Sequence, residues 1–298
     1  MTASEPKPRD GTRSAEPWTI RRVLTWATQD FASRGFECPS LDAELLLSHA
    51  LGVDRIRLIV DSNVALQPDQ LLAARELIQR RRTAEPIAYI LGRREFYGME
   101  FRVDPRVLIP RPDTEILVEV ALKRTESRSL YGRALDLCTG SGCVAIALSK
   151  ARSTWQLMAT DTSQDALDAA RHNAERLGAL HNLTLRRSDL FAQLEPTKLD
   201  LITCNPPYIP AAEIATLAPD IRNFEPRLAL DGGEDGLQLI RVIVTQAKHF
   251  LNPGGILAME VGAGQSSAVS SLFEAAGYAA IELQRDYGGH ERVVSGQV

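Results

Sequence analysis

The stretch Asp136-Leu137-Cys138-Thr139-Gly140-Ser141-Gly142 ends one predicted strand, 134–138, and opens a predicted helix, 143–150. Gly140 and Gly142 allow the backbone to turn tightly and to approach a ligand closely. The free N–H groups at the start of a helix favour polar or anionic atoms. A nucleotide-like ligand fits this turn, although a short G-x-G motif also occurs in ordinary strand-to-helix turns.

The chain on the carboxyl side of this turn alternates short apolar or β-branched runs with helical patterns. Further strands are predicted at 155–160, 183–187, 199–204, 256–261 and 279–284, with helices at 164–177, 237–251 and 265–275. Arg292-Val293-Val294 predicts a last strand antiparallel to its neighbour. This alternation predicts the α/β class: a Rossmann-like, mostly parallel, doubly wound sheet that binds ligands at the carboxyl ends of its strands.

Asp161 follows the second strand of this sheet, where a carboxylate can accept hydrogen bonds from both ribose hydroxyls of an adenosine. Alternatively, Asp161 caps the next helix, a role for which Thr162 and Ser163 compete. The glycine turn and the acid together place an adenosine at the point where the strand order reverses. They do not distinguish NAD from S-adenosylmethionine.

The later strands favour a methyltransferase. Ala145 stands where a dinucleotide-binding fold has its third glycine, and Asp189 can contact an adenine amino group. The fourth strand ends in Asn205-Pro206-Pro207-Tyr208. The Asn205 side-chain oxygen and a neighbouring backbone carbonyl can accept both N–H bonds of a flat amide or amino group, and the Tyr208 ring can cover its face. Such a grip suits methyl transfer to a planar nitrogen.

Composition excludes several classes of protein. The chain has 298 residues and a formal net charge of -4, which does not favour a dedicated nucleic-acid binder. Four scattered cysteines suit a reducing cytoplasm. The five histidines form no metal-binding motif, so no metal is expected. No apolar run is long enough to span a bilayer, and the polar, proline-containing stretch 1–17 predicts a disordered leader.

The first part of the chain predicts a separate helical domain over 18–92. Its helices include a segment 41–51 capped by Ser40, a short piece 55–60 and a helix opened by Pro68. Apolar runs at 96–103 and 107–109, on either side of Asp104-Pro105, predict a hairpin linker over 93–112. The methyltransferase domain would then occupy 113–298.

Several motifs taken together resemble the PrmC/HemK family of peptide chain release factor glutamine methyltransferases. The likeness runs from about the first helix to the C-terminus. The matching segments are Ile87 to Gly92, Phe96 to Gly98, Leu108 to Glu115, Asp136 to Gly142, Asn205 to Tyr208, Glu225 to Gly233 and Arg285 to Gly288. Each motif is unspecific by itself, whereas their combination is specific to the family.

The resemblance implies a class I methyltransferase domain that uses S-adenosylmethionine and releases S-adenosylhomocysteine. The product would be N5-methylglutamine in the Gly-Gly-Gln loop of class-I release factors, which the helical domain helps to recognise. We expect a cytoplasmic monomer without stable nucleic-acid binding. The residues implied for the cofactor are Cys138, Thr139, Gly140, Ser141, Gly142, Asp161, Asp189, Leu190 and Asn205. Those implied for the glutamine are Asn205, Pro206, Pro207 and Tyr208, with Arg111 and Glu115 also contacting the substrate.

Two residues depart from the family pattern, since Cys138 stands where glycine is usual and Leu190 where an aromatic is common. Three alternatives stay open. A paralogous family methylates a glutamine of a ribosomal protein, but Arg111-Pro112-Asp113-Thr114-Glu115 follows the release-factor pattern. An adenine N6 methyltransferase of nucleic acid would meet the same two N–H donors. A non-enzymatic adaptor of the translation machinery could bind the cofactor, but it would have no need for residues that hold an amide group.

Overall fold

The computed structural model describes residues 17–298, so the predicted leader lies outside the described residues except for Pro17. The chain forms two compact units, the first ending at Ile90 and the second beginning at Leu91. Within the described residues, no helix has the length and apolar character needed to cross a bilayer.

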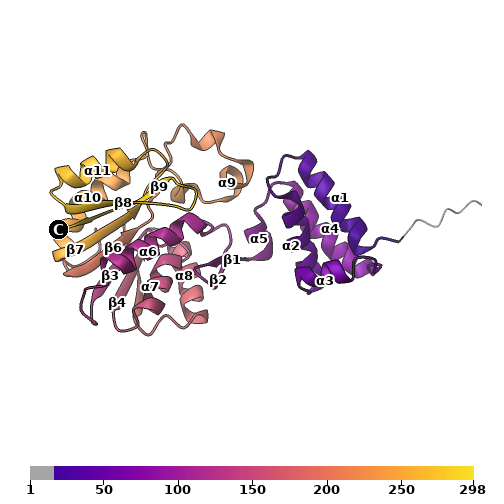
Figure 1. Cartoon of the computed structure of the whole chain (residues 1–298), viewed down its shortest axis with the longest axis horizontal. Coiled ribbons are helices and arrows are strands. Elements are labelled where there is room, and N and C mark those ends of the chain that lie inside the picture. The colour runs from indigo at the N-terminus through magenta and orange to yellow at the C-terminus, as the bar shows by residue number, and fades with distance from the viewer. Residues whose placement is uncertain (1–16) are drawn as a thin grey trace, which may run out of the picture. The chain divides into compact units, whose positions relative to one another are not determined.

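The first unit is helical, as its sequence predicts. Its helices are α1 (Ile20–Ser33), α2 (Pro39–Leu51), α3 (Arg55–Val60), α4 (Pro68–Arg82) and α5 (Ile87–Leu91) (Figure 1). Phe31, Leu46, Leu47 and Leu58 form a fully buried core. The predicted Ser40 cap is wrong by two residues, because Pro39 takes the first helical position and Cys38 becomes the N-cap.

A hairpin opens the second unit, formed by β1 (Arg93–Phe96) and β2 (Met99–Arg102). Its turn lies at Tyr97-Gly98 and not at Asp104-Pro105, and residues 107–109 are not a strand. Both turn residues have positive φ, +50° and +70°. Two-residue hairpin turns favour that geometry, yet a tyrosine rarely adopts it, so Tyr97 carries no ordinary turn signal.

The second unit contains one mixed sheet of seven strands. They are β3 (Arg133–Leu137), β4 (Gln156–Asp161), β5 (Leu183–Arg187), β6 (Leu199–Cys204), β7 (Leu251–Glu260), β8 (Ala279–Arg285) and β9 (Glu291–Gln297). Their order is β5-β4-β3-β6-β7-β9-β8, parallel from β5 through β7 and antiparallel at β9 and β8 (Figure 1). The predicted doubly wound sheet and its antiparallel last strand are confirmed, and the order reverses between β3 and β6.

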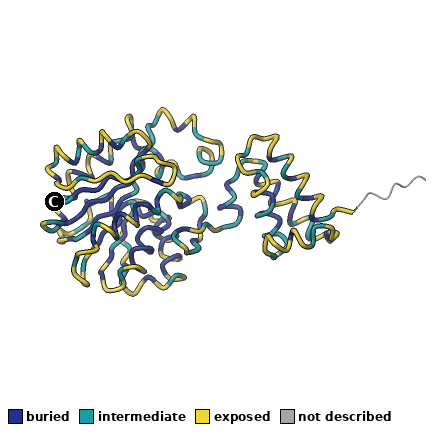
Figure 2. The backbone as a smooth tube through the Cα atoms, in the orientation of Figure 1, coloured by how far each residue is buried: buried dark blue, intermediate teal, exposed yellow. Residues whose placement is uncertain are grey.

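Helices cover the faces of this sheet. They are α6 (Glu115–Arg124), α7 (Cys143–Ala151), α8 (Gln164–Arg176), α10 (Gln238–Phe250) and α11 (Ser266–Ala275). Figure 2 shows the central strands of the sheet buried and the outward sides of the helices exposed, while the edge strand β8 is largely exposed. In α10, the buried residues Ile240, Ile243, Val244 and Ala247 recur at helical spacing and join the core beside β6 and β7.

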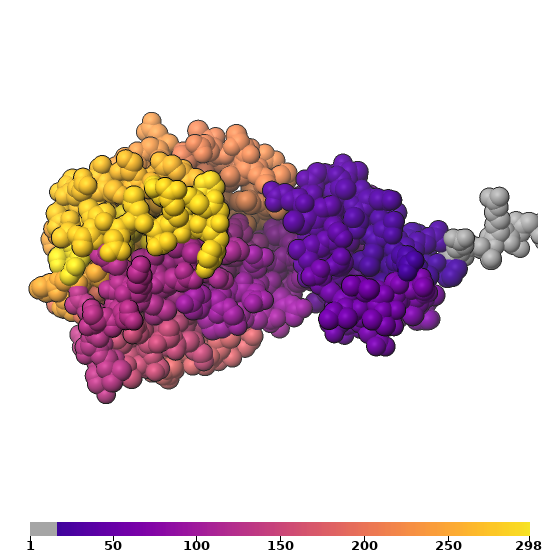
Figure 3. Space-filling view, viewed as in Figure 1, coloured from indigo at the N-terminus to yellow at the C-terminus, as the bar shows by residue number. Residues whose placement is uncertain are grey.

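Helix α6 was not predicted. Its residues 116–118, 120 and 121 are all buried and form a nearly continuous apolar run, so no 3.6-residue period marks them as a helix. Short helical turns occupy the remaining connections: η1 (Pro112–Thr114), η2 (Ile214–Thr216), α9 (Pro219–Phe224) and η3 (Arg227–Ala229). The segment that contains η2, α9 and η3 forms part of the surface drawn in orange in Figure 3.

Candidate active site

A pocket lies at the carboxyl ends of β3, β4 and β6, where the strand order reverses; it is called the sheet-edge pocket below. Most residues predicted for the cofactor line it: Cys138, Thr139, Gly140, Ser141, Asp161, Asp189, Leu190 and Asn205. Pro207 and Arg111 also line it. Gly142, Pro206, Tyr208 and Glu115 are not among the lining residues. The predicted residues that line the pocket therefore come from five separate segments of the chain.

Asp136, on β3, stabilises the start of the glycine turn through hydrogen bonds to its carboxylate. Its two carboxyl oxygens accept hydrogen bonds from the hydroxyls of Thr139 and Thr203, each at 2.7 Å. Burial raises the pKa of Asp136 to about 6, although these hydrogen bonds favour the charged form. A carboxyl held in this way links β3 to β6 and lies among the residues that line the pocket.

The turn itself has a left-handed backbone at three residues, Cys138, Gly140 and Gly142, with φ of +55°, +54° and +81°. An added Cβ at Gly142 would lie 3.1 Å from both Ala170 Cβ and Ile146 Cδ1, whereas Gly140 faces open space. Gly142 therefore permits close packing of α7 and α8, and Gly140 keeps the backbone open toward the pocket. Cys138 adopts the left-handed backbone conformation that is usual for glycine, although it carries a side chain.

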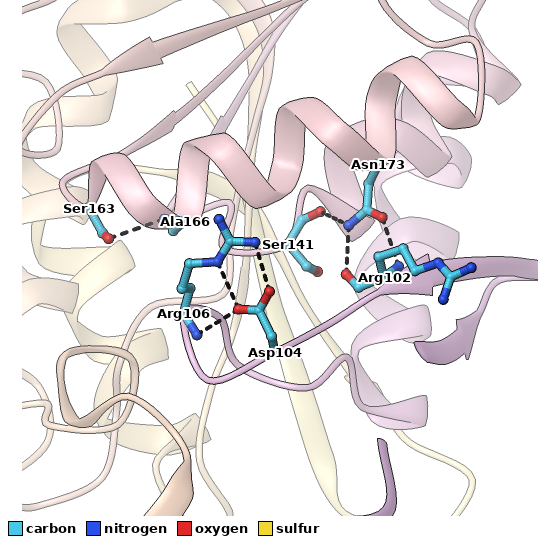
Figure 4. A network of polar contacts seen from close by, with 7 residues as sticks. All are labelled: Arg102, Asp104, Arg106, Ser141, Ser163, Ala166 and Asn173. Atoms are coloured by element: carbon cyan, nitrogen blue, oxygen red, sulfur yellow. Dashed lines mark hydrogen bonds and ion pairs between the residues drawn. The ribbon is translucent and has the colours of Figure 1, made fainter. Parts of the chain in front are cut away.

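Asp161 spans the turn and the start of α8. Its Oδ2 accepts a hydrogen bond from Gly140 N at 3.0 Å, and its Oδ1 accepts one from Ser163 N at 2.9 Å. The N-cap of α8 is Ser163, whose hydroxyl accepts from Ala166 N (Figure 4). The alternative that Asp161 itself caps the helix is thus wrong. Burial raises its pKa, opposed by its backbone hydrogen bonds.

Asn173 is a supporting residue that sequence reasoning missed. From α8, its Oδ1 accepts from Arg102 N at 2.8 Å, and its Nδ2 donates to the carbonyls of Arg102 and Ser141, both at 3.0 Å (Figure 4). It is fully buried. One amide thereby ties the hairpin and the glycine turn to α8. An isolated asparagine in a helix carries no sequence signal for such a contact.

Asp189 and Leu190 follow β5 at the side of the pocket. Leu190 has a positive φ of +47°, and its carbonyl accepts a hydrogen bond from the Ser188 hydroxyl at 2.8 Å. Asp189 is exposed, and its backbone N–H donates to Gln193 Oε1 at 2.7 Å. The Asp189 carboxylate therefore stays available to a ligand amino group.

The Asn205–Tyr208 segment is held from three directions. Asn205 Nδ2 donates to Thr114 Oγ1 at 3.2 Å, and the Tyr208 hydroxyl donates to Glu260 Oε1 at 3.2 Å. Gln265 Nε2 donates to the Tyr208 carbonyl at 2.9 Å. Within residues 17–298, neither Asn205 Oδ1 nor the Pro206 carbonyl accepts a hydrogen bond from another residue. The segment thus has one amide nitrogen engaged and two neighbouring oxygens free.

Arg111 and Glu115, predicted for the substrate, have partners within the protein. Arg111 pairs with the buried Glu225, which also accepts a hydrogen bond from Ile109 N at 3.3 Å. Glu115 Oε1 accepts from Tyr97 N at 2.8 Å and so holds the hairpin turn. Burial raises the pKa of Glu225, and Arg111 opposes that rise. Arg111 thus holds the segment that contains Glu225 beside the pocket.

Removing the Arg111 charge should destabilise this unit. In Arg111→Met, Glu225 would lose its cation, and we expect the free energy of unfolding to fall by about 1–3 kcal/mol. Urea unfolding of the whole chain measures this change. Arg227→Met is the matched control, because Arg227 pairs with Asp231 at an exposed position and such pairs contribute about 0–1 kcal/mol. Equal losses in the two variants would contradict a structural role for Arg111.

Comparisons with known proteins identify the class. The family model of the methyltransferase small domain matches residues 112–220. The hMettl16 catalytic domain in complex with MAT2A 3′UTR hairpin 6 superposes with a TM-score of 0.57 at 14% identity, over 74% of this chain and 81% of that one. A methyltransferase from Pyrococcus furiosus gives 0.50 at 19% identity, over 76% and 98%. The sheet, its switch-point pocket and these matches define a class I methyltransferase.

Sequence relatives identify the family. The model of the PrmC N-terminal domain matches residues 22–92. A release factor glutamine methyltransferase of Geobacter sulfurreducens is 45% identical, covering 96% of this chain and 99% of that protein. One from Rhodopirellula baltica is 42% identical, covering 96% and 98%. The chain belongs to the release factor glutamine methyltransferase family, so the predicted family and the predicted enzyme class are confirmed.

Proposed function

We propose that the protein methylates the side-chain amide nitrogen (N5) of the glutamine in the Gly-Gly-Gln loop of class-I release factors, as a cytoplasmic monomer. S-adenosylmethionine would be the methyl donor. The observation that carries the proposal is the state of the Asn205–Tyr208 segment. Its two free oxygens, Asn205 Oδ1 and the Pro206 carbonyl, match the two N–H bonds of one carboxamide.

The sheet-edge pocket fits the cofactor. Gly140 exposes backbone toward the pocket, and Asp161, which also lines it, would accept hydrogen bonds from the ribose hydroxyls. Asp189 is available to an adenine amino group, and Leu190 and Pro207 supply apolar contact. When bound, S-adenosylmethionine supplies a methyl group carried on a positively charged sulfur. Among the described residues, no group of three or more potential ligands could hold a metal ion.

The protein's contribution to the reaction is positioning. A carboxamide nitrogen is a weak nucleophile, because its lone pair is delocalised into the carbonyl. Acceptance of both N–H bonds by Asn205 and Pro206 would fix that nitrogen and stabilise the positive charge that develops on it. Fixed geometry of this kind removes about 7–11 kcal/mol of a barrier in the best intramolecular models. Tyr208, anchored by its hydroxyl and its carbonyl, would cover the amide and exclude water.

Mass spectrometry tests the proposed product. The purified enzyme is incubated with S-adenosylmethionine and a class-I release factor, and the Gly-Gly-Gln peptide is fragmented. We expect a 14 Da increase located on the glutamine side chain. Parallel reactions contain RNA, DNA or a glutamine-containing ribosomal protein. Methylation in one of those reactions, with none on the release factor, would establish the corresponding alternative substrate. Cofactor binding without turnover on any of them would indicate an adaptor.

Cofactor affinity should fall in acid. Burial raises the pKa of Asp136 to about 6 and also raises that of Asp161. A cationic ligand favours the ionised carboxylates, which exist above these pKa values, so binding should release protons and weaken as the pH falls through about 6. Isothermal titration calorimetry between pH 5 and pH 8, in buffers of different ionisation enthalpy, measures both effects.

The neutral product S-adenosylhomocysteine provides the control, since it lacks the sulfonium charge and should show a shallower pH dependence. In Asp136→Asn the part of the dependence near pH 6 should disappear. A cofactor affinity that is constant from pH 5 to pH 8 would contradict the assignment of these carboxyls to the pocket.

A further inference from the structure

The side chain of Gln265, the N-cap residue of α11, joins two backbone groups beside the Asn205–Tyr208 segment. Its Oε1 accepts a hydrogen bond from Gly262 N, and its Nε2 donates one to the Tyr208 carbonyl, both at 2.9 Å. A backbone N–H can only donate and a backbone carbonyl can only accept. These two partners therefore allow the Gln265 amide one orientation, with its NH₂ group toward Tyr208.

The peptide unit between Tyr208 and Ile209 is held on both sides. Its carbonyl accepts from Gln265, and its N–H, which belongs to Ile209, donates to the Leu230 carbonyl at 3.0 Å. Because a peptide unit is planar, hydrogen bonds on its two sides fix the direction of the whole plane. Among the described residues, Gln265 supplies the hydrogen bond on the carbonyl side. Without it, the plane can rotate about the remaining bond to Leu230.

Two buried glycines enclose the Gln265 amide at both of its ends. An added Cβ at Gly236 would lie 2.6 Å from Gln265 Nε2, and one at Gly262 would lie 2.8 Å from Gln265 Oε1. A side chain at either position would displace the amide. Two separate segments of the chain thus leave the space that this one amide occupies.

The two prolines make the Asn205–Tyr208 segment stiff. Their rings fix φ at Pro206 and Pro207, and a residue that precedes a proline is restricted to extended conformations, which limits Asn205 and Pro206. The prolines also lack N–H groups, so they cannot donate hydrogen bonds that would hold the segment. A contact at its carboxyl end therefore influences the direction of the Pro206 carbonyl as well.

We propose that Gln265 is a positioning residue that acts through the Tyr208 carbonyl to hold the Pro206 carbonyl and the Tyr208 ring in place for the substrate carboxamide. The inference rests on the proposed function, because it assigns to Gln265 the support of the groups that would hold the glutamine. Gln265 itself would touch neither the cofactor nor the reacting nitrogen.

Two substitutions remove the hydrogen bond to Tyr208 in different ways. Gln265→Glu keeps the size of the side chain and the acceptor for Gly262 N, but a carboxylate oxygen then faces the Tyr208 carbonyl. Gln265→Met keeps the length of the side chain and loses both hydrogen bonds. We expect kcat with a release factor to fall about 100-fold in both variants, as when a positioned group moves by about 1 Å. KM should change little, because the loss is confined to the transition state.

Gln246→Glu and Gln246→Met are the matched controls, because Gln246 is an exposed glutamine on α10. Both should keep the kcat of the wild type. A Gln265→Met enzyme with the kcat of the wild type would overturn the inference. A higher KM at unchanged kcat would also overturn it, since that result indicates support of binding alone. Failure of the wild type to methylate any release factor would instead refute the proposed function.

Acid should restore activity to Gln265→Glu, because a protonated carboxyl regains an O–H donor for the Tyr208 carbonyl. Asp136 and Glu260, whose pKa values burial raises to about 6 and about 7, titrate in every variant. The kcat of each variant is therefore divided by that of the wild type at the same pH, from about pH 8 to about pH 5. This ratio should rise in acid for Gln265→Glu and stay constant for Gln265→Met. A constant ratio in both would refute the role of the donor.

Crystal structures of the wild type and of Gln265→Met give a readout that needs no turnover. We expect the peptide unit between Tyr208 and Ile209 to rotate in the variant and the Pro206 carbonyl to change direction. Unchanged positions of both carbonyls would refute the role of Gln265 whatever the substrate is.

Discussion

Asn205→Ala should abolish nearly all methyl transfer while leaving the fold intact. The substitution removes the side-chain oxygen proposed to accept one N–H of the substrate glutamine, an interaction that strengthens as positive charge develops on the nitrogen. Loss of one preorganised hydrogen-bonding group in an active site costs about 10²–10³-fold in kcat, or about 2.7–4 kcal/mol. Single-turnover kinetics with a release factor and saturating S-adenosylmethionine would measure the effect.

The fold should tolerate this change, because Asn205 is only partly buried and its one hydrogen bond is to Thr114. Thermal unfolding therefore serves as an internal control. Asn63→Ala, the same chemical change at an exposed turn of the first unit, should leave kcat unchanged. If Asn205→Ala turned over at a rate near that of the wild type, Asn205 would have no place in the mechanism.

Gly236→Ala should cost both stability and activity, because this glycine lies directly against Tyr208. A Cβ built there would lie 2.3 Å from the Tyr208 carbonyl oxygen and 2.6 Å from Gln265 Nε2, at a φ of +74°. The Tyr208 backbone must move, and with it the preceding residues of the Asn205–Tyr208 segment. A displacement of about 1 Å in a positioned group can lower the rate about 10²-fold. Overpacking adds about 1–3 kcal/mol to the loss of stability.

Gly178→Ala is the matched control for backbone strain. Gly178 has a similar φ of +67°, and no atom lies within 4 Å of a Cβ placed there. Both variants place an alanine in the left-handed region, at a cost of about 1–2 kcal/mol. The difference between them in urea unfolding and in kcat therefore reports the contact with Tyr208. Identical behaviour of the two variants would show that Gly236 does not support the site.

The sequence predicted the parts of the molecule whose signals are local. The strands ending at Asp161 and Cys204 have apolar runs of strand length, and turn residues follow them, so the sheet and its ligand edge could be placed before the structure was known. The Asn205–Tyr208 segment was conspicuous for the same reason, as a polar residue and two prolines directly after a buried strand. The positions of these residues at one edge follow from parallel pairing of β3, β4 and β6.

The missed features depend on contacts between distant segments. Thr114 is 91 residues from Asn205, and Glu260 is 52 residues from Tyr208. No pattern in either neighbourhood marks these pairings, because a buried threonine or glutamate at a strand end looks the same with or without a partner. The hairpin turn was misplaced for another reason, since Tyr97 adopts a backbone conformation that its residue type disfavours.

The left-handed backbone at Cys138 bears on which residues can occupy this position during evolution. This conformation costs a side-chain-bearing residue about 1–2 kcal/mol that glycine would not lose. The surrounding turn already imposes that conformation through Gly140, Gly142 and Asp161. Cysteine and glycine can therefore replace one another at this position during divergence, altering how firmly the domain is folded while its chemistry stays the same.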